Sequence, residues 1–118
     1  MDIALLLKTA TALLSFTALG GLIMAVLRFA GADRPPSWLA MGHGLLAGGG
    51  LTLLLYAGFT EGLPQLAWIG TGLLVLAALG GVFLNLAYHD RRLALPKPVI
   101  VVHAILALAG FTLIFLSW

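Results

Sequence analysis

Four long apolar stretches dominate the chain, at roughly residues 3–29, 37–58, 64–88 and 97–117. Each reaches or exceeds the ~20 residues that a helix needs to cross a hydrocarbon core about 30 Å thick. Because that core offers no water to the backbone, each stretch should be a helix. Only 8% of the residues are charged, whereas soluble proteins carry about 25%. The sequence therefore predicts an all-α, integral membrane four-helix protein, with residues 1–118 forming a single transmembrane domain.

The chain also repeats itself with an offset of 60 residues. Without a gap, residues 1–58 match residues 61–118 at 15 positions. His43 matches His103 in this alignment. Other matched positions are Gly20 and Gly21 with Gly80 and Gly81, Ala47 with Ala107, and Gly50 with Gly110. We interpret the chain as two copies of one helical hairpin, and we expect the short loops to produce an up-down-up-down bundle.

The charged residues predict an orientation in the membrane. Five of the six Lys and Arg residues lie in or beside the two loops at residues 28–37 and 89–98. The positive-inside rule assigns these loops to the cytoplasm. Both termini would then face the periplasm of a bacterial inner membrane, a location suggested by the compact form of the chain. This topology explains the net charge of +2 without a nucleic-acid partner.

The two matched histidines should lie at one depth in the bundle. Each is six residues beyond the expected start of its helix, at residues 37 and 97, which is roughly 9 Å inside the boundary. The two helices run in the same direction and should be diagonal partners, about 11–14 Å apart. Ionisable groups inside a membrane are costly and usually functional. His43 and His103 are therefore the candidate ligands of one planar metal centre, with one imidazole on each side.

Small residues surround both histidines. Ala47 and Gly50 follow His43 by four and seven residues and share its helix face, and Ala107 and Gly110 do the same for His103. The glycine pairs at 20–21 and 80–81 should reach a similar depth. These residues could leave room for a bulky flat ligand. They could equally serve close helix packing, which small residues commonly permit in membranes.

This arrangement resembles the membrane b-type cytochromes, namely the four-helix haem-binding bundle of respiratory cytochrome b and the cytochrome b561-like proteins. In the former, histidines on the second and fourth helices ligate haem, and glycines on the first and third helices let the porphyrin approach. The resemblance implies that His43 and His103 are axial ligands and that the two glycine pairs lie beside the haem. It also implies electron transport as the function.

The chain departs from that family at the position of a second haem. A second pair of histidines would lie some four turns further along each ligand helix, where this chain has Tyr56–Ala57 and Leu116–Ser117. We therefore expect a single-haem variant with one haem b per chain. No C-x-x-C-H motif is present, so the haem should be bound non-covalently.

Several basic residues lie near the expected haem edge. Arg28, Arg91 and Arg92 are placed where haem propionates would emerge, and a cation there could pair with a carboxylate. Membrane topology alone would also explain these arginines. His89 has no counterpart in the repeat, because the equivalent residue is Phe29. We expect an interfacial position for His89, with proton uptake or quinone contact as the functional alternative.

Three function classes follow from these features. The first is a membrane electron-transfer subunit that exchanges electrons near the cytoplasmic face with a quinone, with other membrane redox subunits or within a homo-oligomer. The second is a structural or assembly subunit whose histidines hydrogen-bond between helices. The third is a small transporter, although the first apolar stretch lacks the glutamate on which small multidrug exporters rely. No arrangement of residues indicates hydrolytic or phosphoryl-transfer chemistry.

Overall fold

A computed structural model describes residues 2–118 of the chain. Its helices are α1 (Ile3–Phe29), α2 (Ser37–Thr60), α3 (Gln65–Leu84), η1 (Asn85–His89) and α4 (Lys97–Phe115). No strand occurs among the described residues. Four helical segments are long and apolar enough to cross a membrane, the third comprising α3 with η1. The expected all-α class and the four candidate transmembrane helices are thus confirmed.

The helix starts follow from local chemistry. Asp2 caps α1, because its carboxylate accepts hydrogen bonds from the backbone N–H groups of Ala4 at 2.9 Å and Leu5 at 3.4 Å. Each of the other three α-helices begins directly after a proline: Pro36, Pro64 or Pro96. Proline has no N–H to lose in a first turn and its fixed φ suits a helix entry.

The end of α3 changes its hydrogen-bond pattern. The α-helix ends at Leu84, and residues Asn85–His89 form one turn of π-helix. In a π turn each N–H group bonds to the carbonyl five residues earlier, whereas in an α-helix it bonds to the carbonyl four residues earlier. Such turns often mark functional positions. The change rotates the end of the segment and determines where the His89 side chain points.

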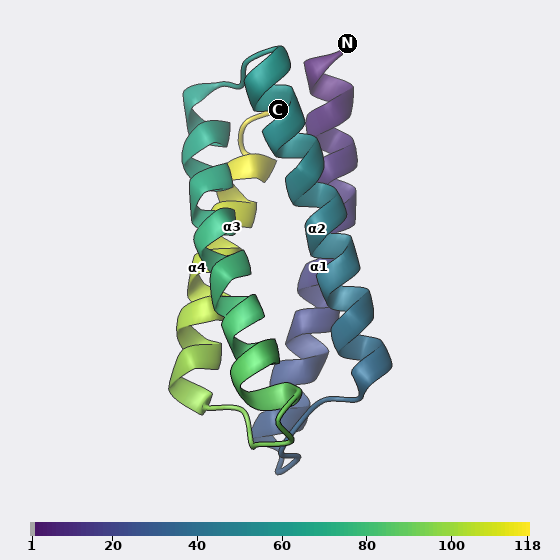
Figure 1. Ribbon diagram of the computed structural model, residues 1–118. Coiled ribbons are helices and arrows are strands. Elements are labelled where there is room, and N and C mark those ends of the chain that lie inside the picture. Colours follow the sequence, from purple (N-terminus) through teal and green to yellow (C-terminus); the bar gives the residue numbers. More distant parts are fainter. Residues whose placement is uncertain (1) are drawn as a thin grey trace.

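Figure 1 shows the four helices running side by side along the long axis of the molecule. The α1–α2 and α3–α4 loops lie at one end, which we call the loop end, and both termini and the α2–α3 loop lie at the other, the terminal end. Helix α1 packs mainly along α2, and α3 packs mainly along α4, with fewer contacts between these two pairs. Among the described residues, no Cα atom of α1 lies within 8 Å of one in α3, and none of α2 lies within 8 Å of one in α4.

The tightest packing lies toward the terminal end. Leu7, Leu54, Ile114 and Thr71 are fully buried there. The remaining residues of this core cluster are Ala10, Leu14, Ala67 and Leu74. A smaller cluster of Leu84, Leu95 and Ile100 lies near the loop end. Many large apolar side chains instead point outward; Phe59 is 80% and Trp38 is 74% exposed. An apolar exterior of this extent suits contact with lipid chains.

Candidate functional site

His43 on α2 and His103 on α4 meet in the interior of the bundle. Their ring centroids are 6.2 Å apart and their ring planes are inclined by 68°. In the described residues, no Cα atom of α2 lies within 8 Å of a Cα atom of α4. Both imidazoles must therefore point inward from opposite sides, so the structure brings together the two residues that the sequence analysis selected.

A backbone carbonyl fixes the orientation of each imidazole. The Nδ1 atom of His43 lies 2.8 Å from the Thr17 carbonyl oxygen on α1, and Nδ1 of His103 lies 2.7 Å from the Ala77 carbonyl oxygen on α3. A carbonyl oxygen can only accept, so Nδ1–H must be the donor in both bonds. In the neutral imidazole, Nε2 then carries a free lone pair. This is the form in which histidine binds metals, with the second nitrogen held by a carbonyl.

The paired glycines make room for the imidazoles. A methyl group at Gly21 would lie 2.9 Å from Cε1 of His43, and one at Gly81 would lie 3.3 Å from Cε1 of His103. At Gly20 and Gly80 the nearest histidine atoms would be 3.9 and 3.6 Å away, which is ordinary contact. The second glycine of each pair is thus the one that lets an imidazole lie against the neighbouring helix.

The other small residues separate into two groups. Ala47 and Ala107 are half-buried, one turn beyond the histidines. Gly50 and Gly110 are buried in helix contacts instead: a methyl group at Gly50 would lie 2.9 Å from Cγ of Leu14, and one at Gly110 would lie 2.8 Å from the Gly70 carbonyl oxygen. These two glycines permit close packing of α1 with α2 and of α3 with α4.

The three arginines selected from the sequence lie near the loop end. Arg28, half-buried at the end of α1, donates from Nε to the Leu95 carbonyl oxygen at 2.8 Å. This bond ties the first helix to the α3–α4 loop. Arg91 and Arg92 are exposed in that loop. Of the three, Arg28 alone belongs to a transmembrane helix.

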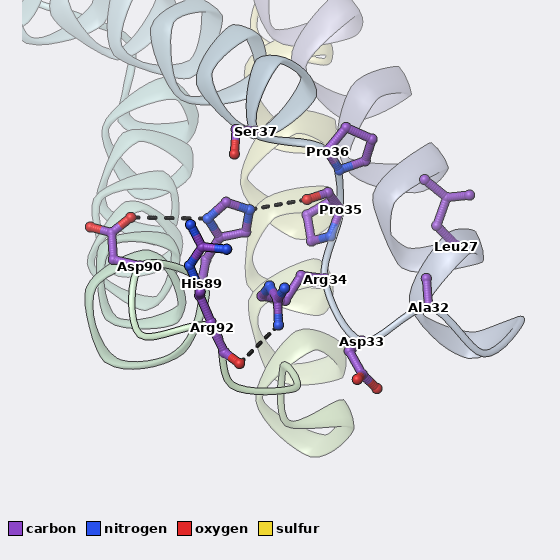
Figure 2. A pocket seen from close by; sticks show the side chains of 10 residues that line it. All are labelled: Leu27, Ala32, Asp33, Arg34, Pro35, Pro36, Ser37, His89, Asp90 and Arg92. Carbon is purple, nitrogen blue, oxygen red and sulfur yellow. Dashed lines mark hydrogen bonds and ion pairs between the residues drawn. The ribbon is translucent and has the colours of Figure 1, made fainter.

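His89 is the last residue of η1, and only 13% of its side chain is accessible. Its Nε2 lies 3.0 Å from the Pro35 carbonyl oxygen, so the imidazole donates a hydrogen bond to the α1–α2 loop. Figure 2 shows the ring between Asp90 and Pro35 at the wall of a cavity formed by the two loops. His89 therefore joins the two loops and lies apart from the histidine pair in the interior.

A second hollow passes beside His43. It is an apolar groove of about 250 Å³ between α1 and α2, with Gly20, Gly42 and His43 in its lining. Phe16, Leu19 and Trp38 also line it, and all three are largely exposed. The groove therefore opens on the apolar outer surface of the first helix pair, and its lining does not include His103.

The carbonyls of Thr17 and Ala77 are the functional groups that sequence analysis missed. Each precedes its histidine by 26 residues, so the two contacts obey the 60-residue offset. The residue types differ, because the contact uses the backbone and not the side chain. The offset between equivalent contacts is the only signal that could have identified them.

The separation of the two rings can be compared with the length expected for two imidazoles on one metal. Imidazoles that ligate one metal through Nε2 from opposite sides have ring centroids roughly 6.3 Å apart, because each metal–nitrogen bond is about 2.0 Å long. The measured centroid separation is 6.2 Å. Among residues 2–118 there is no group of three or more His, Cys, Asp or Glu side chains that could hold an ion. A zinc site, which needs three or four protein ligands, does not fit this pair.

No protein-family model, curated protein or solved structure matches this chain.

Proposed function

We propose that this chain is a membrane electron-transfer subunit that binds one haem b non-covalently between His43 and His103. We also propose that the helices form an up-down-up-down bundle of two repeated hairpins. In this arrangement the chain resembles the membrane b-type cytochromes. The observation that carries it is the imidazole pair: two inward-pointing rings with a centroid separation of 6.2 Å, each with Nδ1 bonded to a carbonyl. A metal in a planar macrocycle needs only these two protein ligands.

The protein would contribute orientation, ligand protonation state and exclusion of water. The Thr17 and Ala77 carbonyls hold the Nδ1 protons, which leaves both Nε2 atoms ready to bind iron. Gly21 and Gly81 let the rings lie flat against α1 and α3. A haem with both axial positions filled exchanges single electrons and does not readily bind oxygen. Arg28, half-buried on α1, is the arginine best placed to pair with a haem carboxylate.

The position of the histidines bears on the partners. They lie nearer the loop end than the terminal end, six residues after the starts of α2 and α4. If the loop end faces the cytoplasm, as the positive-inside rule requires, a single haem there cannot carry electrons across the bilayer by itself. We therefore propose a quinone, another membrane redox subunit or a second copy of this chain as the electron-exchange partner, in a bacterial inner membrane.

One observation favours a second candidate function. Each histidine hydrogen-bonds the adjacent helix of its own pair, α1 for His43 and α3 for His103. A centroid separation of 6.2 Å is also within the ~4.5–7 Å range of direct edge-to-face ring contacts. The histidines could thus act as helix linkers in a structural or assembly subunit. That function predicts that His→Gln variants, which keep a side-chain donor, fold and assemble normally.

The test is a reduced-minus-oxidised visible spectrum of the protein purified in mild detergent after expression with sufficient haem. We expect a sharp α band of a low-spin b-type haem, and we expect either His43→Ala or His103→Ala to abolish it. His89→Ala is the matched control, because it removes an imidazole that lies at the loops, and it should keep the band. A colourless wild-type protein would refute the haem proposal and favour the linker function.

A further inference from the structure

The loop end contains a cavity that is separate from the histidine pair. Its volume is about 700 Å³, within the ~300–1,000 Å³ range of ligand pockets. Figure 2 shows it between the α1–α2 loop and the segment that follows η1. Its lining residues are Leu27, Ala32, Asp33, Arg34, Pro35, Pro36, Ser37, His89, Asp90 and Arg92.

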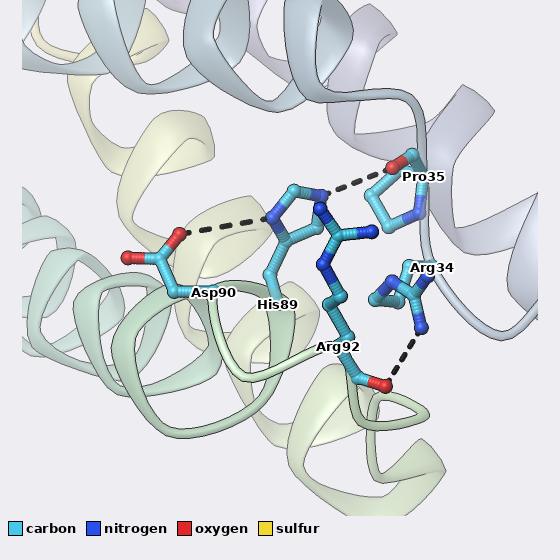
Figure 3. A network of polar contacts seen from close by, with 5 residues as sticks. All are labelled: Arg34, Pro35, His89, Asp90 and Arg92. Carbon is cyan, nitrogen blue, oxygen red and sulfur yellow. Dashed lines mark hydrogen bonds and ion pairs between the residues drawn. The ribbon is translucent and has the colours of Figure 1, made fainter.

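Two arginines, Arg34 and Arg92, line this cavity. Arg34 donates from Nη1 to the Arg92 carbonyl oxygen at 2.8 Å, as Figure 3 shows. That bond uses one of the five N–H donors of Arg34. The guanidinium of Arg92 has no hydrogen bond to residues 2–118, and neither arginine has a carboxylate within 4.0 Å in that part of the chain. Both groups therefore retain donors for a ligand.

The backbone of Arg92 supports a specific role for this arginine. Its φ is 57°, and it is the only non-glycine residue of the described chain with positive φ. Glycine adopts this conformation without steric cost, whereas a side chain raises its energy. The α3–α4 loop nevertheless has an arginine at this position. Strained residues of this kind are concentrated at ligand sites.

The cavity also carries negative charge. Asp33 and Asp90 belong to its lining, and neither has an Arg or Lys nitrogen within 4.0 Å among the described residues; the Oδ1 atom of Asp90 lies 4.0 Å from Nδ1 of His89. The lining thus has two cationic and two anionic side chains, with no ion pair between them. A ligand that offers both signs of charge would satisfy these groups, whereas a purely anionic ligand would face two carboxylates.

The repeat does not account for these arginines. The residue equivalent to Arg34 is Ala94, and the residue equivalent to Arg92 is Ala32. Each pair of helices therefore contributes one arginine, and from non-equivalent positions. The 60-residue repeat therefore does not explain why each of the two loops has an arginine at this cavity.

The cavity lies just beyond the ends of the apolar helices. α1 ends at Phe29 and α2 begins at Ser37, so the cavity is at the level where lipid headgroups meet a membrane protein. We propose that it binds the headgroup of a zwitterionic aminophospholipid. The phosphate would accept hydrogen bonds from Arg34 and Arg92, and the ammonium group would lie near Asp33 or Asp90. Arginine suits phosphate because its planar fork can donate two parallel bonds.

The test is native mass spectrometry of the delipidated full-length protein, titrated with phosphatidylethanolamine, phosphatidylcholine and phosphatidylglycerol. Phosphatidylethanolamine should bind roughly tenfold more tightly than phosphatidylcholine, whose quaternary ammonium cannot donate a hydrogen bond. Arg92→Gln should weaken phosphatidylethanolamine binding roughly tenfold, and this substitution breaks no hydrogen bond of the Arg92 side chain. Asp33→Asn combined with Asp90→Asn should reduce the affinity to that for phosphatidylcholine.

Arg91→Gln is the matched control, because Arg91 carries the same charge in the same loop but does not line the cavity. It should leave lipid affinity unchanged. Equal losses in Arg91→Gln and Arg92→Gln would show a general charge effect and overturn the proposal. So would equal binding of all three lipids, or tightest binding of phosphatidylglycerol. If inorganic phosphate binds with the same dependence on Arg92 while the lipids do not, the site is for a soluble anion and the lipid assignment is wrong.

Discussion

The two ends of the bundle use glycine in different ways. Toward the terminal end, Gly70 and Gly110 bring the backbones of α3 and α4 together, so that a methyl group on either would meet a carbonyl oxygen of the other helix at 2.8–2.9 Å. Nearer the loop end, Gly21 and Gly81 face imidazoles of the adjacent helix instead. The same residue type therefore supports helix packing at one level and places a polar ring at the other.

This difference separates the half of the bundle that contains the packed core from the half that contains the proposed haem site. The terminal half contains fully buried side chains such as Leu7, Leu54 and Ile114, which provide a conventional core. Nearer the loop end, His43 and His103 are half-buried and meet in the centre. Substitutions in the terminal half should change the free energy of unfolding, and substitutions beside the histidines should change cofactor affinity.

The largest expected effect on stability is that of Gly110→Ala. The added methyl group would lie 2.8 Å from both the Gly70 carbonyl oxygen and Cγ of Leu74, so α3 and α4 must separate. We expect the free energy of unfolding to fall by about 1–3 kcal/mol, measured by denaturation in mixed detergent micelles. Gly72→Ala is the control, because no atom lies within 4 Å of its added methyl group. Similar losses in both variants would contradict the packing difference.

Gly21→Ala tests the histidine level. Its methyl group would lie 2.9 Å from Cε1 of His43 and would force the ring away from its present orientation. Because an off-rotamer side chain costs about 0.5–1.5 kcal/mol, we expect roughly tenfold weaker haem affinity with little change in stability. Haem titration of the apoprotein measures this. Gly20→Ala should bind haem normally, since its methyl group comes no closer than 3.9 Å to His43; equal effects would refute the assignment.

The equivalent substitution in the second helix pair should have a smaller effect. A methyl group at Gly81 would lie 3.3 Å from Cε1 of His103, which a shift of a few tenths of an ångström can relieve. We expect about threefold weaker haem affinity for Gly81→Ala, and a normal affinity for Gly80→Ala. If Gly81→Ala weakened haem affinity more than Gly21→Ala did, the space beside His103 would be tighter than the space beside His43, contrary to these distances.

An effect of similar size distinguishes two equivalent threonines of the terminal half. Thr11 and Thr71 each bond the carbonyl four residues earlier, but Thr11 also accepts a hydrogen bond from Nε1 of Trp118 at 2.8 Å. Thr11→Val should therefore destabilise the protein by about 0.5–1.5 kcal/mol more than Thr71→Val. Equal unfolding free energies would show that the Trp118 contact contributes nothing.

The transmembrane helices were predictable because their signal is local. Apolar length identifies a membrane helix whatever its neighbours, and proline marks each of three helix starts. The π turn at Asn85–His89 was not predictable, since hydropathy does not distinguish hydrogen bonding to the fourth residue from bonding to the fifth. The third apolar stretch, expected at residues 64–88, corresponds to the helical span Gln65–His89, whose last five residues form the π turn.

The histidine pair was predictable from the sequence, and the contacts that support it were not. The repeat and the depth argument selected His43 and His103, which the structure brings together. The angular position of a side chain about its helix depends on tertiary packing, so the sequence could not show that Gly21 faces His43 while Gly50 faces Leu14. Backbone acceptors such as the Thr17 carbonyl carry no side-chain signal at all.

The central claim is that His43 and His103 bind one iron from opposite sides. Low-temperature electron paramagnetic resonance of the oxidised protein, purified with haem, tests it most directly. We predict a low-spin ferric signal in the wild type, and its loss in both His43→Ala and His103→Ala. A high-spin signal in the wild type, or a low-spin signal that survives either substitution, would show that the two imidazoles do not ligate one iron together.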